Sequence, residues 1–186
     1  MLVTCCNETF KTPDFLTVYN ISAGERKRKT EENYMASTIT PASLTVTVKE
    51  SITLNGSEMG ATNTLTIASI NEISQRIVTI DASNVRTLFE FGTTVAQGKF
   101  VSANVKYIRI TNKDDTNPVS INIERASSNC WVTVTAGSSW WLAATNSAID
   151  ADDDTTIAAP VFQNITKISG HGGSNAVDVD CYVALT

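Results

Sequence analysis

Apolar and polar residues alternate with a period of two along much of the chain. Between residues 44 and 54, Leu, Val and Ile recur at alternate positions among polar residues. This period predicts a β-strand that turns one face to a core and the other to water. Asn55-Gly56 follows directly, and because both residues tolerate positive φ, the pair predicts a hairpin turn. We expect a loop over residues 57–63, after which Leu65 and Ile67 lie on the partner strand.

The clearest strand pattern covers residues 105–111. Its alternation divides the side chains between two faces, with Ile108 and Ile110 expected on the inner one. Residues 112–118 are polar and have side chains that can cap their own backbone. They predict a turn that joins this strand to the next, residues 119–123, as a β-hairpin. The face opposite Ile108 would carry Val105, Tyr107, Arg109 and Thr111.

Further strand patterns recur at short intervals, and no long stretch has a helical period. His171 begins a glycine-rich segment, residues 171–175, that predicts a turn before the last strand. The chain therefore predicts an all-β fold, an antiparallel β-sandwich or jelly roll of about eight to ten strands. The further strands are expected over residues 76–81, 85–91, 130–135, 140–142, 161–168 and 177–185.

The first 34 residues differ from the rest of the chain. Residues 1–34 lack a sustained period of either kind, whereas regular alternation begins soon after Met35. The adjacent Glu codons of residues 31–32 can read GAGGAG, which resembles a bacterial ribosome-binding site upstream of the Met35 codon. We therefore expect residues 1–34 to be a translated leader from a misplaced start, or a flexible arm that embraces a neighbouring subunit. Residues 35–186 are expected to form a single β-sandwich domain.

The charge of the chain argues against nucleic acid as a partner. The formal net charge is -5 and the sequence pI about 4.8, and an acidic protein does not neutralise a phosphate backbone. One basic cluster occurs, at residues 26–29, within the expected leader. No apolar run is long enough to cross a bilayer, and the N-terminal region lacks the apolar segment of a signal peptide. We therefore expect synthesis in the cytoplasm and no membrane partner.

The four cysteines do not predict a metal site. Cys5 and Cys6 are adjacent, which is not the spacing of a metal-binding pair. Cys130 and Cys181 both adjoin strand patterns, and in a reducing cytoplasm we expect two buried thiols. Their spacing leaves open whether the two form a disulfide.

No combination of residues predicts catalysis or a cofactor. Acid–base and nucleophilic mechanisms need a base held near a nucleophile, and the single histidine, His171, is flanked by glycines that leave it poorly fixed. A weak calcium candidate is an acidic loop, because calcium prefers clustered oxygen ligands. The loop lacks the EF-hand spacing, so we interpret it as a solvated turn that can touch a neighbouring subunit. Its carboxylates belong to Asp150, Asp152, Asp153 and Asp154.

Three tryptophans raise the question of sugar binding, because flat aromatic faces stack on sugar rings. Trp140 and Trp141 are adjacent, so on a strand their side chains point to opposite faces and cannot form one platform. We expect one of them in the core and the other at a subunit interface or a sugar-stacking surface. Trp131 lies in a different predicted strand.

Several segments together suggest a family. They are residues 52–56, 76–79, 105–112 and 114–117, and the most specific part is the third and fourth segments followed by residues 119–124. In these segments the chain resembles small virion structural proteins of marine tailed bacteriophages. The resemblance covers roughly residues 42–142. It implies a capsid-associated or tail-associated role, and it assigns no functional residues.

We therefore expect a bacteriophage virion structural protein, either a capsid decoration or cement protein or a component of a fibre or knob. It would be assembled in the host cytoplasm and located in the virion. Its partners would be a capsid or tail protein of the same virion and further copies of itself, in a homo-oligomer for which we favour a trimer. The alternative is a carbohydrate-binding module or host-surface adhesin on a β-sandwich.

Overall fold

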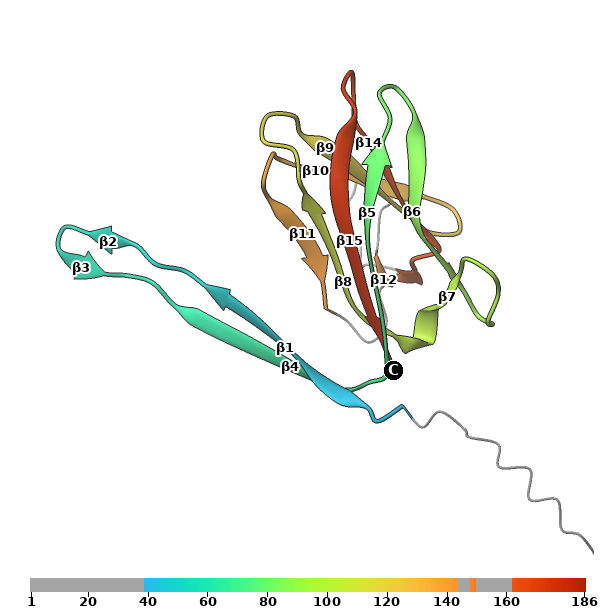
Figure 1. Ribbon diagram of the computed structural model, residues 1–186, viewed down its shortest axis with the longest axis horizontal. Helices are drawn as coiled ribbons and strands as arrows, with labels where there is room; N and C mark the ends of the chain where they lie inside the picture. Colours follow the sequence, from blue (N-terminus) through green and yellow to red (C-terminus); the bar gives the residue numbers. More distant parts are fainter. Residues whose placement is uncertain (1–38, 144–147, 150–161) are drawn as a thin grey trace, which may run out of the picture. The chain divides into compact units, whose positions relative to one another are not determined.

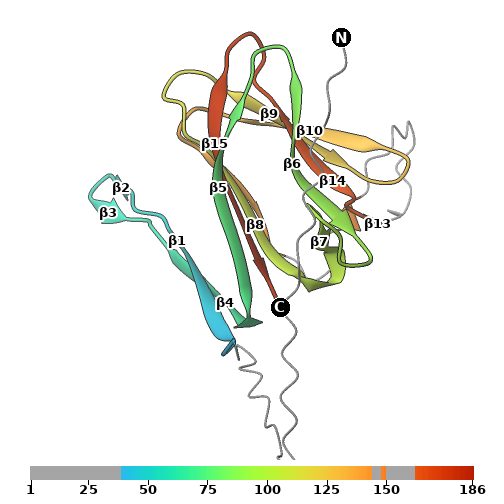
Figure 2. The same cartoon turned by 45° about the vertical axis from the view of Figure 1, so that its right-hand side comes forward.

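Eight long strands form two facing β-sheets (Figure 1), and Figure 2 shows the same two layers after a turn of 45°. The computed structural model describes residues 39–143 and 162–186 and the backbone of Ala148–Ile149. The chain divides into the units Met1–Ser37 and Thr38–Thr186, and all described residues belong to the second. The expected leader, residues 1–34, lies outside the described residues.

Sheet I contains four antiparallel strands in the order β11-β8-β15-β5. The inner strand β15 pairs along its whole length with β5, from Val177↔Ile80 to Leu185↔Glu72, and on its other side with β8. The strands of sheet I are β5 (Glu72–Ile80), β8 (Val105–Asn112), β11 (Ser139–Leu142) and β15 (Val177–Leu185).

Sheet II contains five strands in the order β10-β9-β14-β6-β7, with β7 parallel to β6. A short 3-10 helix, Ser102–Asn104, leads from β7 into β8. The short strands β12 (Ala148–Ile149) and β13 (Gln163–Asn164) form a separate pair. The strands of sheet II are β6 (Val85–Gly92), β7 (Phe100–Val101), β9 (Val119–Glu124), β10 (Asn129–Val134) and β14 (Lys167–His171).

The order in which the chain visits the two sheets is that of a jelly roll. The chain passes from one sheet to the other after each long strand except β9, which is followed by its own neighbour β10. Eight strands in two sheets with such crossings form a double-sheet jelly roll, so the predicted all-β sandwich or jelly roll is confirmed. The predicted hairpin between residues 105–111 and 119–123 is wrong, because β8 and β9 lie in different sheets and their polar turn bridges the layers.

An apolar core fills the space between the sheets. Ile108 and Ile110 face it and are 1% and 0% exposed, as their alternation predicted. Val105 also belongs to the core, contrary to its predicted face, because the register of β8 against β15 shifts between Ala184 and Leu185. A shift of one residue moves a side chain to the other face of a strand. Other buried core residues are Ile80, Leu88, Phe89, Ile121, Ile168, Val179 and Val183.

The connection from β8 to β9 is held by amide and carboxylate side chains. Asn112 is 1% exposed, and its Nδ2 donates to the carbonyl oxygens of Asn117 at 2.8 Å and Val134 at 3.2 Å. Its Oδ1 accepts the Asp114 backbone N–H at 3.0 Å. The Asp114 carboxylate in turn accepts the N–H groups of Asn117 and Thr116 at 2.7 and 2.8 Å, and these bonds lower the pKa of Asp114. The predicted self-capping turn is therefore present, although it bridges two sheets.

His171 lies in a strand and not in a loop. It is the last residue of β14 and pairs with Val85 on one side and Ser120 on the other. Its Nδ1 accepts the Gly173 backbone N–H at 3.0 Å. Among the described residues, the predicted strand over residues 161–168 is divided between β13 and β14, and β14 continues to His171. The expectation of a poorly fixed histidine is wrong, since two neighbouring strands hold its backbone.

Residues 42–70 form a long hairpin that belongs to neither sheet, and we call it the arm. Asn55 and Gly56 form its turn with φ of 51° and 78°, the signs that a type I′ turn requires. β3 follows the turn at once, so the predicted loop over residues 57–63 is wrong. These residues are the beginning of the return strand. The strands of the arm are β1 (Ala42–Lys49), β2 (Thr53–Leu54), β3 (Ser57–Glu58) and β4 (Thr62–Ile70).

Candidate assembly surface

A single register runs through the arm from Leu44↔Ile67 to the tip, after a shift at the base between Ala42 and Leu44. The pairing of β1 with β4 and that of β2 with β3 keep the same offset. Between them, backbone hydrogen bonds of 2.8 Å join Glu50 to Ala61 and Met59 to Ile52. Because side chains alternate between the two faces along each strand, this constant register sorts the side chains of the arm into two distinct faces.

One face of the arm is polar and the other is apolar. The polar face is a ladder of threonines that ends near the tip in Glu58, whose carboxylate accepts hydrogen bonds from Ser51 and Thr53 at 3.3 and 3.2 Å. The other face, which we call the arm apolar face, has Glu50 as its charged residue. Its apolar members are Leu44, Val46, Val48, Ile52, Leu54, Met59, Ala61, Leu65 and Ile67.

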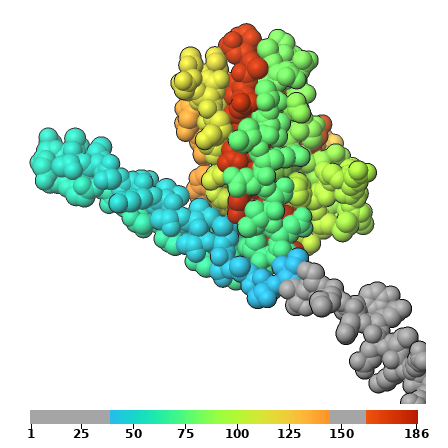
Figure 3. Space-filling view, in the orientation of Figure 1, coloured from blue at the N-terminus to red at the C-terminus, as the bar shows by residue number. Residues whose placement is uncertain are grey.

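The base of the arm apolar face packs on the outer face of sheet I. Leu44, Val46 and Ile67 are half-buried there against a small cluster that includes Tyr107 and Ala184. Beyond the base, the apolar side chains are 37% to 65% exposed, and Figure 3 shows no other segment over the visible face of the distal arm. The predicted buried face is therefore wrong for most of the hairpin, because a two-stranded ribbon has no second layer to cover it. The exposed members are Val48, Ile52, Leu54, Met59 and Leu65.

An aromatic group occupies the outer face of sheet I next to the arm base. The ring of Tyr107 lies 6.0 Å from that of Tyr182 and 6.5 Å from that of Trp141. The Arg109 guanidinium lies 5.4 Å from the Tyr182 ring centroid and 2.7 Å from the Asp180 carboxylate. Burial raises the pKa of Tyr107, against a smaller opposing effect of the nearby Arg109 charge. The group is suited to contact and stacking, since its ionisable members are paired or held neutral.

Sequence reasoning found Trp141 in this group and missed its neighbours. Arg109 and Asp180 are 71 residues apart in the chain, and no local pattern signals their proximity. The adjacent Trp140 lies on the inner side of β11 and packs against the core, whereas Trp141 points outward and is 47% exposed. This is the division that strand alternation predicts. Trp131 lies on β10 in sheet II, so the three indoles do not form one surface.

Two exposed apolar residues of β5 on the outer face of sheet I form what we call the outer patch: Ile73 and Ile77. Trp141 is also exposed on this face, but it lies on β11 at the opposite edge of the sheet. Ile73 pairs with Ala184, beside the arm base, and Ile77 pairs with Asp180 two rows further along β15. Both isoleucines belong to β5, an edge strand whose second side has no partner strand among the described residues. The outer patch therefore combines exposed apolar surface with an open sheet edge, two features typical of contact sites.

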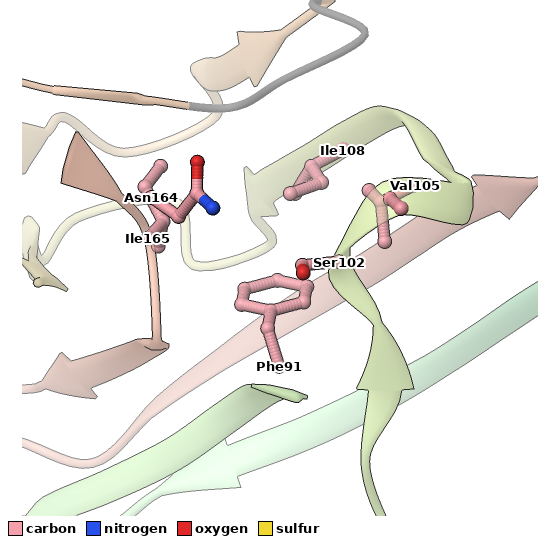
Figure 4. Close-up of a pocket in the computed structure, with 7 residues that line it drawn as sticks. Phe91, Ser102, Val105, Ile108, Asn164 and Ile165 are labelled. Carbon is pink, nitrogen blue, oxygen red and sulfur yellow. The ribbon is translucent and has the colours of Figure 1, made fainter. Parts of the chain in front are cut away.

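A recess between the sheets is the other concave feature of interest (Figure 4). It encloses about 410 Å³, part of it open to solvent. None of its lining side chains is ionisable, and the Ser102 hydroxyl donates to the carbonyl oxygen of Gly92 at 3.3 Å. The recess thus offers apolar contact and lacks an acid–base pair in its walls. Its lining residues are Phe91, Ser102, Ala103, Val105, Ile108, Asn164 and Ile165.

The candidate metal ligands are not brought together in the described structure. Asp150, Asp152, Asp153 and Asp154 lie outside the described residues, so the calcium loop stays a prediction. Within residues 39–143 and 162–186, no group of three or more His, Cys, Asp or Glu side chains could hold a metal ion. The same part of the chain has no helix of the length and apolarity that crossing a membrane would need.

Cys130 and Cys181 are free thiols in different environments. Cys181 is buried in the core on β15, and burial raises its pKa to about 12. Cys130 on β10 is exposed, so the prediction of two buried thiols is half wrong. Cys130 lies on the same face of β10 as the core residues Val132 and Val134, so its exposure comes from its place near the start of an edge strand of sheet II.

We expect a thiol reagent to distinguish these two cysteines. In a Cys5→Ser/Cys6→Ser chain at pH 8, Ellman's reagent should modify Cys130 at once and Cys181 only after unfolding in guanidinium. At a pKa of about 12, only about one Cys181 thiol in ten thousand is a thiolate at that pH, and the thiolate is the reactive form. Adding Cys130→Ser should abolish the rapid reaction. Two rapidly reacting thiols in the folded protein would contradict the burial of Cys181.

Comparisons with known proteins identify no family for this chain. No protein-family model matches the chain, and no curated protein sequence matches it. Among solved structures, one similar chain belongs to work described as "Bacillus endospore appendages form a novel family of disulfide-linked pili". It is 16% identical with a TM-score of 0.35, and the match covers 61% of this chain and 85% of that chain. At these values the two proteins share neither a demonstrated fold nor a demonstrated function.

Proposed function

We propose that this protein is a non-enzymatic structural subunit of a bacteriophage virion, either a capsid decoration or cement protein or a component of a fibre or knob. The observation that carries the proposal is the arm, a hairpin whose apolar face is covered at its base and exposed over the rest of its length. In a protein that remained a monomer, this apolar surface would stay exposed to water. A subunit of an assembly buries it against a neighbour.

The physical properties of the arm support a role in assembly. A single two-stranded hairpin is only marginally stable in water, and exposed contiguous apolar surface marks contact sites in soluble proteins. The strands of the arm keep one register from Leu44↔Ile67 to Leu54↔Ser57. Both of its edges are unpaired within the described chain. Contact with another protein would cover the apolar face and order the ribbon.

Two further arguments favour a virion over other assemblies. Residues 42–142 resemble small virion structural proteins of marine tailed bacteriophages, with the most specific likeness in the segments that became β8 and β9. Jelly rolls are also a recurrent architecture of viral capsid domains, although lectins use them too and the fold by itself does not assign a function. On this proposal, the partners are a capsid or tail protein of the same virion.

The proposal is tested in purified phage particles. We expect mass spectrometry of gradient-purified particles to find this chain in a fixed ratio to a known capsid or tail protein. A chain in which residues 44–67 of the arm are replaced by a short Gly-Ser linker should fold but be lost from the particles. Absence of the unmodified chain from washed particles would contradict the virion role.

A carbohydrate-binding module or host-surface adhesin is a second candidate, and the observation that favours it is Trp141. Its indole is 47% exposed, and Trp141 pairs across the strands with Arg109, so an exposed ring and a guanidinium donor are neighbours that a sugar ring can use. A glycan array probed with the purified chain separates the two candidates. Binding that Trp141→Ala abolishes and Trp131→Ala retains would favour the adhesin.

A further inference from the structure

We propose that the exposed part of the arm apolar face docks on the outer patch of a second copy of this chain. The docking segment carries Val48, Ile52, Leu54, Met59 and Leu65, and the receiving surface carries Ile73 and Ile77 of β5. The proposal gives the homo-oligomer expected from the sequence a specific pair of contact surfaces. It also stands without that role, because self-association is a property of the purified protein.

The distribution of exposed apolar residues singles out these two surfaces. Of the thirteen large apolar side chains that are exposed in the described structure, five lie on the arm apolar face and two form the outer patch. The threonine face of the arm has none. Exposed apolar side chains that cluster on a surface mark a contact site. The arm apolar face and the outer patch are two such surfaces, and one of them can bind the other.

The contact at the arm base shows that these two kinds of surface fit each other. Leu44, Val46 and Ile67 of the arm apolar face already pack on Tyr107 and Ala184 of the outer face of sheet I. The distal arm continues the first surface in the same register. Ile73, which pairs with Ala184, continues the second toward the open edge of β5. The docked contact would extend an interface that the protein makes within one copy.

We choose a second copy as the partner because neither surface is covered within a single copy of the described chain. Leu54 and Met59 near the arm tip are 55% and 65% exposed, and Ile73 and Ile77 are 56% and 68% exposed, in the presence of the whole described chain. Another copy brings a free arm and a free outer patch in equal number. Each surface therefore has a partner in a solution of this protein alone.

A contact between two different surfaces has a consequence for symmetry. Each copy that receives an arm still has its own arm free, so the contact is heterologous and repeats until a ring closes or a filament grows. A closed ring of three copies would be the trimer that we favour from the sequence.

The first test is the mass of the full chain by light scattering at micromolar concentration in reducing buffer. We expect the unmodified protein to be at least twice its chain mass of 20.0 kDa. Leu65→Asp on the arm apolar face and Ile77→Asp in the outer patch should each lower the mass to one chain. Thr64→Asp, the adjacent residue on the threonine face, and Val95→Asp, at an exposed apolar residue outside both surfaces, should leave it unchanged. All four positions are exposed, so the four variants should melt at nearly the same temperature.

The second test is complementation between the two damaged copies. A Leu65→Asp chain keeps its outer patch, and an Ile77→Asp chain keeps its arm, so an equal mixture should form a 1:1 dimer of about 40 kDa. A monomeric unmodified protein, or equal effects of Leu65→Asp and Thr64→Asp, would overturn the proposal. A mixture that stays at 20.0 kDa would overturn it as well. Absence from phage particles would leave these masses untouched, so the two proposals fail separately.

Discussion

Ile108→Asp is expected to abolish cooperative folding of the jelly roll, whereas Arg109→Ala on the next residue of β8 should cost about 1 kcal/mol or less. Ile108 is 1% exposed in the core, and an unpaired carboxylate there costs several kcal/mol, a large share of a typical total of about 5–15 kcal/mol. Arg109 lies on the opposite, outer face. Its contacts with Asp180 and Tyr182 are partly solvated, with 35% of its side chain exposed.

Urea unfolding followed by circular dichroism measures both effects. Because Ile108→Asp is expected to yield no folded baseline, Ile108→Ala supplies a measurable variant, with an expected loss of about 2–5 kcal/mol in the free energy of unfolding. The order of stability should be unmodified protein, Arg109→Ala, Ile108→Ala and Ile108→Asp. Equal midpoints for Arg109→Ala and Ile108→Ala would show that the faces of β8 are assigned the wrong way round.

Asn112→Ala is expected to lower the free energy of unfolding by about 2–4 kcal/mol, an unusually large effect for removal of one amide. The substitution deletes the side-chain hydrogen bonds to the carbonyl oxygens of Asn117 and Val134. Val134 is itself buried, so its carbonyl oxygen is left without this donor in a place that water reaches poorly. The Asp114 N–H loses its acceptor at the same time.

Thermal unfolding provides the comparison, with Asn175→Ala as the matched control. Asn175 donates a hydrogen bond of 2.9 Å to the Asn117 side chain but is exposed, so water replaces its partner at little cost. On the scale of about 2–4 °C per kcal/mol for domains of this size, Asn112→Ala should melt several degrees below Asn175→Ala. Similar melting temperatures would mean that water reaches the Val134 carbonyl oxygen.

Local patterns predicted the strands well because alternation reports burial directly. The last strand, residues 177–185, agrees with β15 at both ends, since it alternates strictly and is buried along one face. The inner face of β8 also follows from its alternation at Ile108 and Ile110. Asn55-Gly56 identified the arm turn, because only a few residue pairs accept two positive φ angles.

Pairing between distant strands could not be predicted in the same way. The segments β8 and β9 are joined by a turn-like sequence, and nothing local distinguishes a turn within one sheet from a connection across two. The arm illustrates a second limit. Its alternation is that of a half-buried strand, yet Val48 and Leu65 are exposed. A period of two shows which face of a strand is apolar, but it does not show whether another part of the same chain packs on that face. The outer patch depends on such long-range pairing as well.

The central place of β15 in sheet I sets the timing of folding during synthesis. The arm is complete when Ile70 has been made, and a hairpin forms within about 1–10 μs. Sheet I can form only after Leu185 has been made, because β15 lies between β5 and β8 and pairs with both. At about 5–20 residues per second, the ribosome needs on the order of 10 s to make the intervening segment. During that interval a nascent chain carries the arm without the sheet on which its base rests, so the arm is an isolated and only marginally stable hairpin until sheet I forms.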